Sequence, residues 1–194
     1  MARHVATGCA LLLLSLFVLA AEATSVRTYS LPGHGILELK VPSSWKETVS
    51  GPPAGLPPTI EFSPASGNGF NVQITPIWSP TGDPDLNRPE VIRALVEKMG
   101  RKQLDQAVET EIRLKEVKGP GAVGYAFTLT DRAPAKGEWT YLTAGAAGVG
   151  DLLVSFTILT NSLDSGELDR ALRMIKESRW SASPSSEAGA LIRP

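Results

Sequence analysis

The fold of this chain is decided by the stretch Gly35-Ile36-Leu37-Glu38-Leu39-Lys40-Val41-Pro42-Ser43-Ser44-Trp45. Its apolar residues alternate with Glu38 and Lys40, and this period of two predicts a strand over residues 35–41 with one buried face. The turn-forming run that begins at Pro42 ends the strand. We expect Trp45, which follows directly, to cover the end of the sheet and close the core, so its role is structural.

Alternation of the same kind predicts a sheet along most of the chain. Further strands are expected over residues 59–62, 70–78, 109–117, 123–129, 138–143 and 152–160. Turn residues separate several of these strands, so that hairpins follow one another along the chain. Consecutive hairpins imply an antiparallel sheet.

Two segments, residues 91–99 and 168–175, change to a helical period. The capping-box pairs expected at their starts are Asn87 with Glu90 and Asp164 with Glu167. Helices of this length can cover a central antiparallel sheet, so we expect a single α+β domain over residues 24–180. The small, polar tail over residues 181–194 is expected to be disordered.

The N-terminus has the features of a cleavable signal peptide over residues 1–23. A short basic start precedes an apolar core, and the small residues that end at Ala23 match a signal-peptidase site. The apolar run is short for a membrane anchor, and we expect no transmembrane segment in the mature chain. A lipoprotein-like box at Cys9 precedes the apolar core instead of following it. The expected location is therefore periplasmic or secreted, after cleavage near Ala23.

Composition argues against several classes of partner and of stabilisation. The formal net charge is −1 and no run of Lys and Arg stands out. Because phosphate contacts demand clustered positive charge, nucleic acid is not an expected partner. The only cysteine is Cys9, inside the leader, so the mature domain has to be stabilised by its core and not by disulfides.

The residues that metal and nucleophile chemistry need are scarce. His34, between two glycines, is the one histidine of the mature chain, and we expect it in a turn. A Ser-His-Asp site is formally possible, but the chain has no G-x-S-x-G elbow, and the ligands of a zinc site are missing. Residues 83–87 open like a calcium loop, but Arg88 and Ala94 stand where Gly and Glu are required. We therefore assign no catalytic, cofactor-binding or metal-binding residues and expect no cofactor.

Three glycines, Gly145, Gly148 and Gly150, lie close together before a strand-like segment. A loop that cradles phosphate has to lead into a helix, whose N-terminus holds the anion. The residues that follow, 152–158, predict a strand instead. We therefore expect the glycines to form a hairpin connection and not a nucleotide site.

Carboxylates and tryptophans leave a second interpretation open. Glu109 and Glu111 are expected on the same face of a strand, where they decorate the surface or perform acid–base work in a cleft. The four tryptophans of the chain are Trp45, Trp78, Trp139 and Trp180. They are expected in core or rim packing, with a ligand cleft as the alternative.

The order of elements over residues 27–180 resembles PsbP-like domains. The strand at residues 35–41 runs into a Pro-x-x-Trp motif at Trp45, as in that group. Residues 172–180 are similar to its closing helix, although Arg179 intrudes before the final aromatic residue. The group also includes Mog-type Ran-binding proteins and DcrB-type envelope proteins. The resemblance implies an α/β/α sandwich with a central antiparallel sheet, and a non-catalytic binding or assembly role.

The leading hypothesis is therefore an exported accessory protein that binds a protein partner in the bacterial cell envelope. The first alternative is a hydrolase that uses Ser or paired carboxylates in a Trp-lined cleft. The second is a carrier of a small ligand. Converging Glu and Ser side chains in a cleft would favour the hydrolase, and an enclosed apolar cavity would favour the carrier.

Overall fold

The computed structural model describes residues 22–51, 56–79 and 84–182. The predicted signal peptide, apart from Glu22 and Ala23, and most of the predicted tail lie outside these ranges. In chain order the elements are β1 (Thr24–Leu31), β2 (Gly35–Pro42), β3 (Trp45–Ser50), β4 (Thr59–Pro64), β5 (Phe70–Ile77), the 3-10 turn η1 (Pro84–Asn87), α1 (Pro89–Arg101), the 3-10 turn η2 (Leu104–Gln106), β6 (Lys115–Lys118), β7 (Val123–Thr130), β8 (Tyr141–Val149), β9 (Leu152–Thr160), α2 (Glu167–Lys176) and β10 (Arg179–Ser181).

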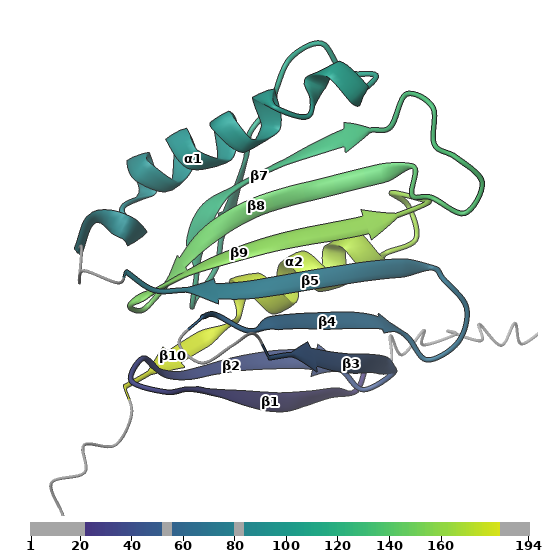
Figure 1. The fold of residues 1–194 in the computed structure, drawn as a ribbon. Helices are drawn as coiled ribbons and strands as arrows, with labels where there is room; N and C mark the ends of the chain where they lie inside the picture. The colour runs from purple at the N-terminus through teal and green to yellow at the C-terminus, as the bar shows by residue number, and fades with distance from the viewer. Residues whose placement is uncertain (1–21, 52–55, 80–83, 183–194) are drawn as a thin grey trace, which may run out of the picture.

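Seven of the strands form one sheet, in the order β3-β4-β5-β9-β8-β7-β6 (Figure 1). Every neighbouring pair in it is antiparallel. The pairing of β5 with β9 joins the early meander β3-β4-β5 to the late meander β6-β7-β8-β9. Ile74 lies opposite Phe156 in this pairing. The predicted antiparallel sheet is confirmed, and with two helices the chain is an α+β protein.

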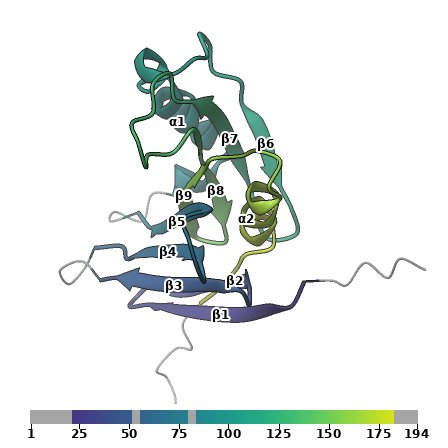
Figure 2. The same ribbon diagram turned by 90° about the vertical axis from the view of Figure 1, so that its right-hand side faces the viewer.

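A second, smaller sheet has the order β1-β2-β10. The chain leaves this smaller sheet where the sequence predicted that the strand ends. β2 ends at Pro42, and Trp45 begins β3 in the larger sheet. Strands β1, β3 and β10 were not among those predicted, and the closing helix expected over residues 172–180 ends at Lys176. β1 pairs along its whole length with β2, from Thr24 opposite Pro42 to Leu31 opposite Gly35. Figure 2 shows this sheet below the larger one, on the side that also carries α2.

The two helices contact opposite faces of the seven-stranded sheet. Leu153 belongs to the buried cluster that contains Ile92 of α1, whereas its neighbour Val154 belongs to the cluster that contains Ile175 of α2. Successive side chains on a strand point to opposite faces, so the two clusters lie on either side of the sheet. Figure 2 shows α1 and α2 on either side of the strands.

An ion pair connects the small sheet with β3. Arg27 of β1 pairs with Glu47 of β3, and its guanidinium also donates to the Trp45 carbonyl oxygen at 3.1 Å. The Tyr29 hydroxyl donates to the same carboxylate at 3.0 Å. These partly buried contacts connect β1 of the small sheet to β3 of the larger one, beside the buried Tyr29 side chain.

Both predicted helix caps are wrong. The N-cap of α1 is Arg88 and the N-cap of α2 is Gly166, which has φ +77°. The side chain of Asn87 donates instead to the carbonyl oxygen of Gly150, 2.9 Å away. The Asn87 side-chain amide, which the local spacing assigned to the start of the helix, therefore bonds to a residue that is distant in the sequence.

Other boundaries also differ from those predicted. The strand expected over residues 109–117 is reduced to β6, and Glu109, at its expected start, binds Thr130 through its carboxylate. Gly145 and Gly148 lie inside β8 and do not form the hairpin turn, where only Gly150 lies, with φ +55°. Ser181, placed at the start of the tail, is the last residue of β10.

A Cβ on Gly145 would stand 2.6 Å from the Phe156 ring, so this glycine leaves room for a core aromatic. The close approach of a neighbouring strand, and not a turn, is what requires glycine here. Among the described residues, no helix has the length and apolarity that crossing a membrane requires.

Candidate functional site

Two tryptophans and the histidine meet in a hollow of about 440 Å³. His34 comes from the β1–β2 turn, Trp78 directly follows β5, and Trp180 lies in β10. Asp151 adds a carboxylate from the β8–β9 turn. These segments gather at one end of the molecule (Figure 1). The site is called the aromatic hollow below.

The His34 imidazole stacks on the Trp78 indole. The ring centroids are 4.3 Å apart and the planes differ by 17°. The turn that presents His34 is closed by a hydrogen bond of 2.7 Å from its backbone N–H to the Leu31 carbonyl oxygen. The prediction of a turn histidine is confirmed, and the ring has an aromatic partner that the sequence did not reveal.

Trp180 is held in place by one hydrogen bond and two glycines. Its indole N–H donates to the His34 carbonyl oxygen at 2.8 Å. A Cβ on Gly35 would lie 2.6 Å from the indole nitrogen, and a Cβ on Gly150 would lie 2.5 Å from the six-membered ring. Only glycine lets the backbone approach the ring so closely, so both turns are shaped around this indole.

The hollow offers apolar and aromatic surfaces with a polar edge. Leu152 and Ala182 line it with aliphatic side chains, and Asp151 is exposed beside Leu152. Among the described residues that line it, none carries a hydroxyl or a thiol. The arrangement suits the burial of an apolar group.

The other two tryptophans lie elsewhere. Trp45 is 4% exposed and packs in the core, with its ring centroid 4.6 Å from that of Phe70. Trp139 lines a separate cleft together with the carboxylates of Asp131 and Glu138. A Trp-lined cleft with two carboxylates therefore exists, but not with the glutamates that the sequence singled out.

Those glutamates, Glu109 and Glu111, have separate partners. Glu109 accepts hydrogen bonds from the Thr130 N–H and hydroxyl, both at 2.8 Å. Burial of Glu109 raises its pKa, but the bonds from Thr130 outweigh this effect and leave the pKa below its usual value. Glu111 pairs with Arg113 at 2.8 Å. Both glutamates border one groove, and each of them already binds another residue of this chain.

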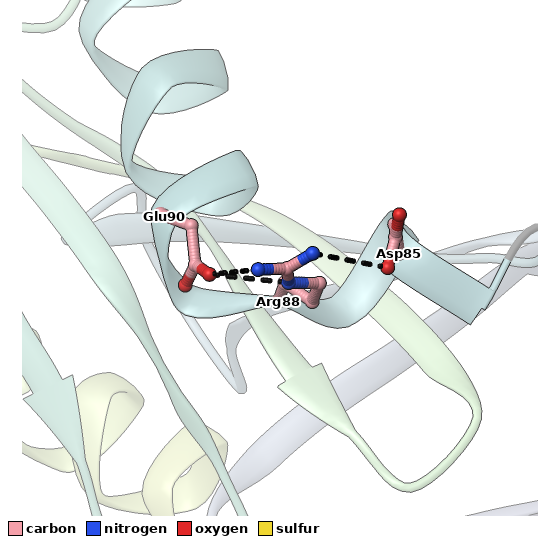
Figure 3. A network of polar contacts seen from close by, with 3 residues as sticks. All are labelled: Asp85, Arg88 and Glu90. Carbon is pink, nitrogen blue, oxygen red and sulfur yellow. Dashed lines mark hydrogen bonds and ion pairs between the residues drawn. The ribbon is translucent and has the colours of Figure 1, made fainter.

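Arg88 forms ion pairs with acidic side chains in and beside the calcium-like segment (Figure 3). Arg88 lies 3.4 Å from Asp85 and 2.7 Å from Glu90. A hydrogen bond from its own backbone N–H, and then the Arg88 guanidinium, lower the pKa of Glu90. Asp83 lies outside the described residues. In the part of the chain that the structure describes, no group of three or more His, Cys, Asp or Glu side chains is placed to hold a metal ion.

No protein-family model and no curated protein sequence match this chain. Among solved structures, it is similar to cyanobacterial PsbP (CyanoP) from Synechocystis sp. PCC 6803, with 15% identity, a TM-score of 0.48, and 87% of this chain and 99% of that chain covered. It is also similar to a crystal structure from Bacteroides thetaiotaomicron VPI-5482, with 14% identity and a TM-score of 0.48. That match covers 76% of this chain and 46% of the other. The first of these structures carries the PsbP name to which residues 35–45 and 172–180 pointed.

Proposed function

We propose that this chain is an exported, non-catalytic accessory protein of the bacterial envelope that binds a protein partner through the aromatic hollow. The observation that carries the proposal is the convergence of His34, Trp78 and Trp180 from three distant segments. We further propose that residues 24–180 form the mature domain, which β10 extends to Ser181, and that its layers form the α/β/α sandwich implied by the PsbP-like resemblance. The placement of α1 and α2 on opposite faces supports this sandwich.

The chemistry of the hollow favours a side chain of a protein as its occupant. Tryptophan is enriched at protein interfaces, because it combines a large apolar area with few rotatable bonds. Trp180 is already fixed by its bond to His34 and by the glycines beside it. A partner therefore meets a preformed surface and loses little free energy to ordering it.

The experiment compares capture of envelope proteins by three immobilised forms of the mature chain. These are the unchanged protein, Trp78→Ala and the control Leu163→Ala. Leu163 is 41% exposed and follows the far end of β9, away from the hollow. We expect one saturable partner to be retained by the unchanged protein and the control, and to be lost with Trp78→Ala.

Thermal unfolding of each variant shows whether a loss of capture reflects a loss of fold. His34→Ala removes the stacked imidazole and is expected to weaken capture in the same direction. Capture of the same proteins by Trp78→Ala and by the unchanged chain would contradict the proposed site. Export is tested separately, by fractionation of cells that express the full chain.

A further inference from the structure

A second aromatic hollow, of about 400 Å³, lies at the opposite end of β8 and β9 from the first. Leu142 and Leu159 lie on its floor, and the Trp139 indole lines it from the β7–β8 loop. Figure 1 shows this loop beyond the arrowhead of β7. The site is called the Trp139 cleft below.

The walls of the Trp139 cleft are joined by Arg132. Its guanidinium donates two hydrogen bonds to the Ala107 carbonyl oxygen, at 2.6 and 3.1 Å. Its backbone N–H donates to the Gln106 carbonyl oxygen at 3.0 Å. The β7–β8 loop is thereby fixed to the segment that follows α1, and the cleft is a built feature of the fold.

Two carboxylates give the cleft a negative charge. Asp131 accepts a hydrogen bond from the Ala133 N–H at 2.8 Å, and Glu138 accepts one from the Ala135 N–H at 2.9 Å. Each bond uses one oxygen and fixes the orientation of the carboxylate. Among the described residues that line the cleft, none is basic, and the nearby Arg132 guanidinium binds the carbonyl oxygen of the lining residue Ala107.

We propose that the Trp139 cleft binds the side chain of an arginine residue of a peptide or protein. A guanidinium is flat, always charged and weakly hydrated, so it stacks on an indole while its N–H groups bind carboxylate oxygens. The three methylene groups of arginine suit the leucine floor. Gln103 and Gln106 at the cleft offer amides to the neighbouring peptide backbone.

The site is independent of the aromatic hollow and of the partner proposed for it. It differs in charge as well as in place, since two carboxylates and no histidine line it. Failure of this inference therefore leaves the proposed function standing, and failure of the proposed function leaves this inference standing.

The test titrates the full mature chain with N-acetyl-arginine methylamide and follows the amide signals by NMR. The matched ligand is N-acetyl-citrulline methylamide, which has nearly the same shape and no charge. For a ligand of this size we expect a Kd on the order of 1 mM, with shifts confined to residues around Trp139. The citrulline and lysine analogues are expected to bind at least about threefold more weakly.

Two variants test whether the arginine analogue binds in the Trp139 cleft. Trp139→Ala and Glu138→Gln should each weaken arginine binding at least about threefold, and 0.5 M salt should weaken it in the unchanged protein. Gln at position 138 keeps an oxygen that accepts the Ala135 N–H, so this variant retains the loop even where Trp139→Ala disturbs it. Glu116→Gln, on exposed β6, and Trp78→Ala, in the other hollow, are the controls and should bind as the unchanged protein does.

Three results would overturn the inference. Equal binding of the citrulline and arginine analogues would show that the cleft does not recognise charge. Equal or tighter binding of the lysine analogue would remove the assignment to a guanidinium. Arginine binding that both Trp139→Ala and Glu138→Gln leave unchanged would place the contact elsewhere.

Discussion

The indole N–H of Trp180 donates to the carbonyl oxygen of His34, and 146 residues separate these two positions in the sequence. This bond joins β10, the last strand, to the turn between the first two strands. The same turn places the His34 ring on Trp78. One hydrogen bond therefore links the two ends of the fold and shapes the proposed binding site.

Gly35→Ala is expected to destabilise the protein more than Gly33→Ala. Both glycines have positive φ, at +90° and +79°, so each substitution costs about 1–2 kcal/mol for the backbone. A Cβ at position 33 meets open space, whereas one at position 35 collides with the Ser181 carbonyl oxygen and with the Trp180 indole. The overpacking at Gly35 adds about 1–3 kcal/mol. Urea unfolding of the two variants measures the difference, and equal losses would argue against a fixed Trp180.

Trp45→Ala is expected to lower the free energy of unfolding by about 3–5 kcal/mol. The indole is 4% exposed and packs against Phe70 and Phe62. Its N–H is buried and meets no acceptor among the described residues, so Trp45→Phe should cost less than Trp45→Ala. Denaturant titration checks this order. An unchanged midpoint for Trp45→Ala, with loss of partner binding, would show that Trp45 is a contact residue and not a core residue.

Stability is expected to fall above about pH 10 because of Tyr29. Burial raises the pKa of its hydroxyl, and the hydrogen bond and charge of Glu47 raise the pKa further, while Arg27 opposes them. The unfolded chain then loses this proton at a lower pH than the folded chain does. The contribution of Tyr29 is thus complete below the unfolded pKa and is lost as the pH rises, by up to about 1.4 kcal/mol per pH unit.

Urea unfolding at pH 8 and pH 11 tests this dependence. Tyr29→Phe should show a smaller decrease between the two values than the unchanged protein does. Tyr141→Phe is the control and should keep the full decrease. An equal decrease in the unchanged protein and in Tyr29→Phe would mean that other groups account for it.

The mature N-terminus is expected to be Thr24, because the small residues before it match a signal-peptidase site. Cleavage there keeps all of β1 but removes Glu22, which pairs with Arg170 at 3.1 Å. Intact-mass measurement of the exported protein decides the point. A species that begins at Met1, or that carries lipid on Cys9, would contradict this prediction.

Removal of metal ions is expected to leave stability unchanged. Residues 24–194 contain one histidine and no cysteine, and Arg88 pairs with Asp85 and Glu90 in and beside the calcium-like segment. Thermal unfolding with and without a chelator measures this directly. A midpoint lowered by many degrees in chelator would reveal a structural metal site.

Local periodicity was sufficient to predict most of the sheet. Alternation over residues 35–41 and 152–160 appears in the structure as β2 and β9, because a strand with one buried face needs an apolar residue at every second position. The helical stripes over 91–99 and 168–175 likewise correspond to α1 and α2. These features depend on the pattern of neighbouring residues, so they could be predicted from the sequence alone.

Contacts between distant segments decided the rest. Asn87 matches a helix cap by spacing but donates to Gly150, and glycine is required at position 145 inside β8 because a Cβ there would collide with the Tyr125 carbonyl oxygen and the Phe156 ring. The hollow around His34 and Trp180 is formed by segments that are far apart in the sequence and meet in the folded structure. The spacing of residues along the chain does not show which distant segments come into contact. Many positions are locally equivalent, and tertiary packing selects among them. The sequence by itself therefore determined both helices and most strands of the larger sheet, and only the tertiary structure decided where the aromatic hollows lie.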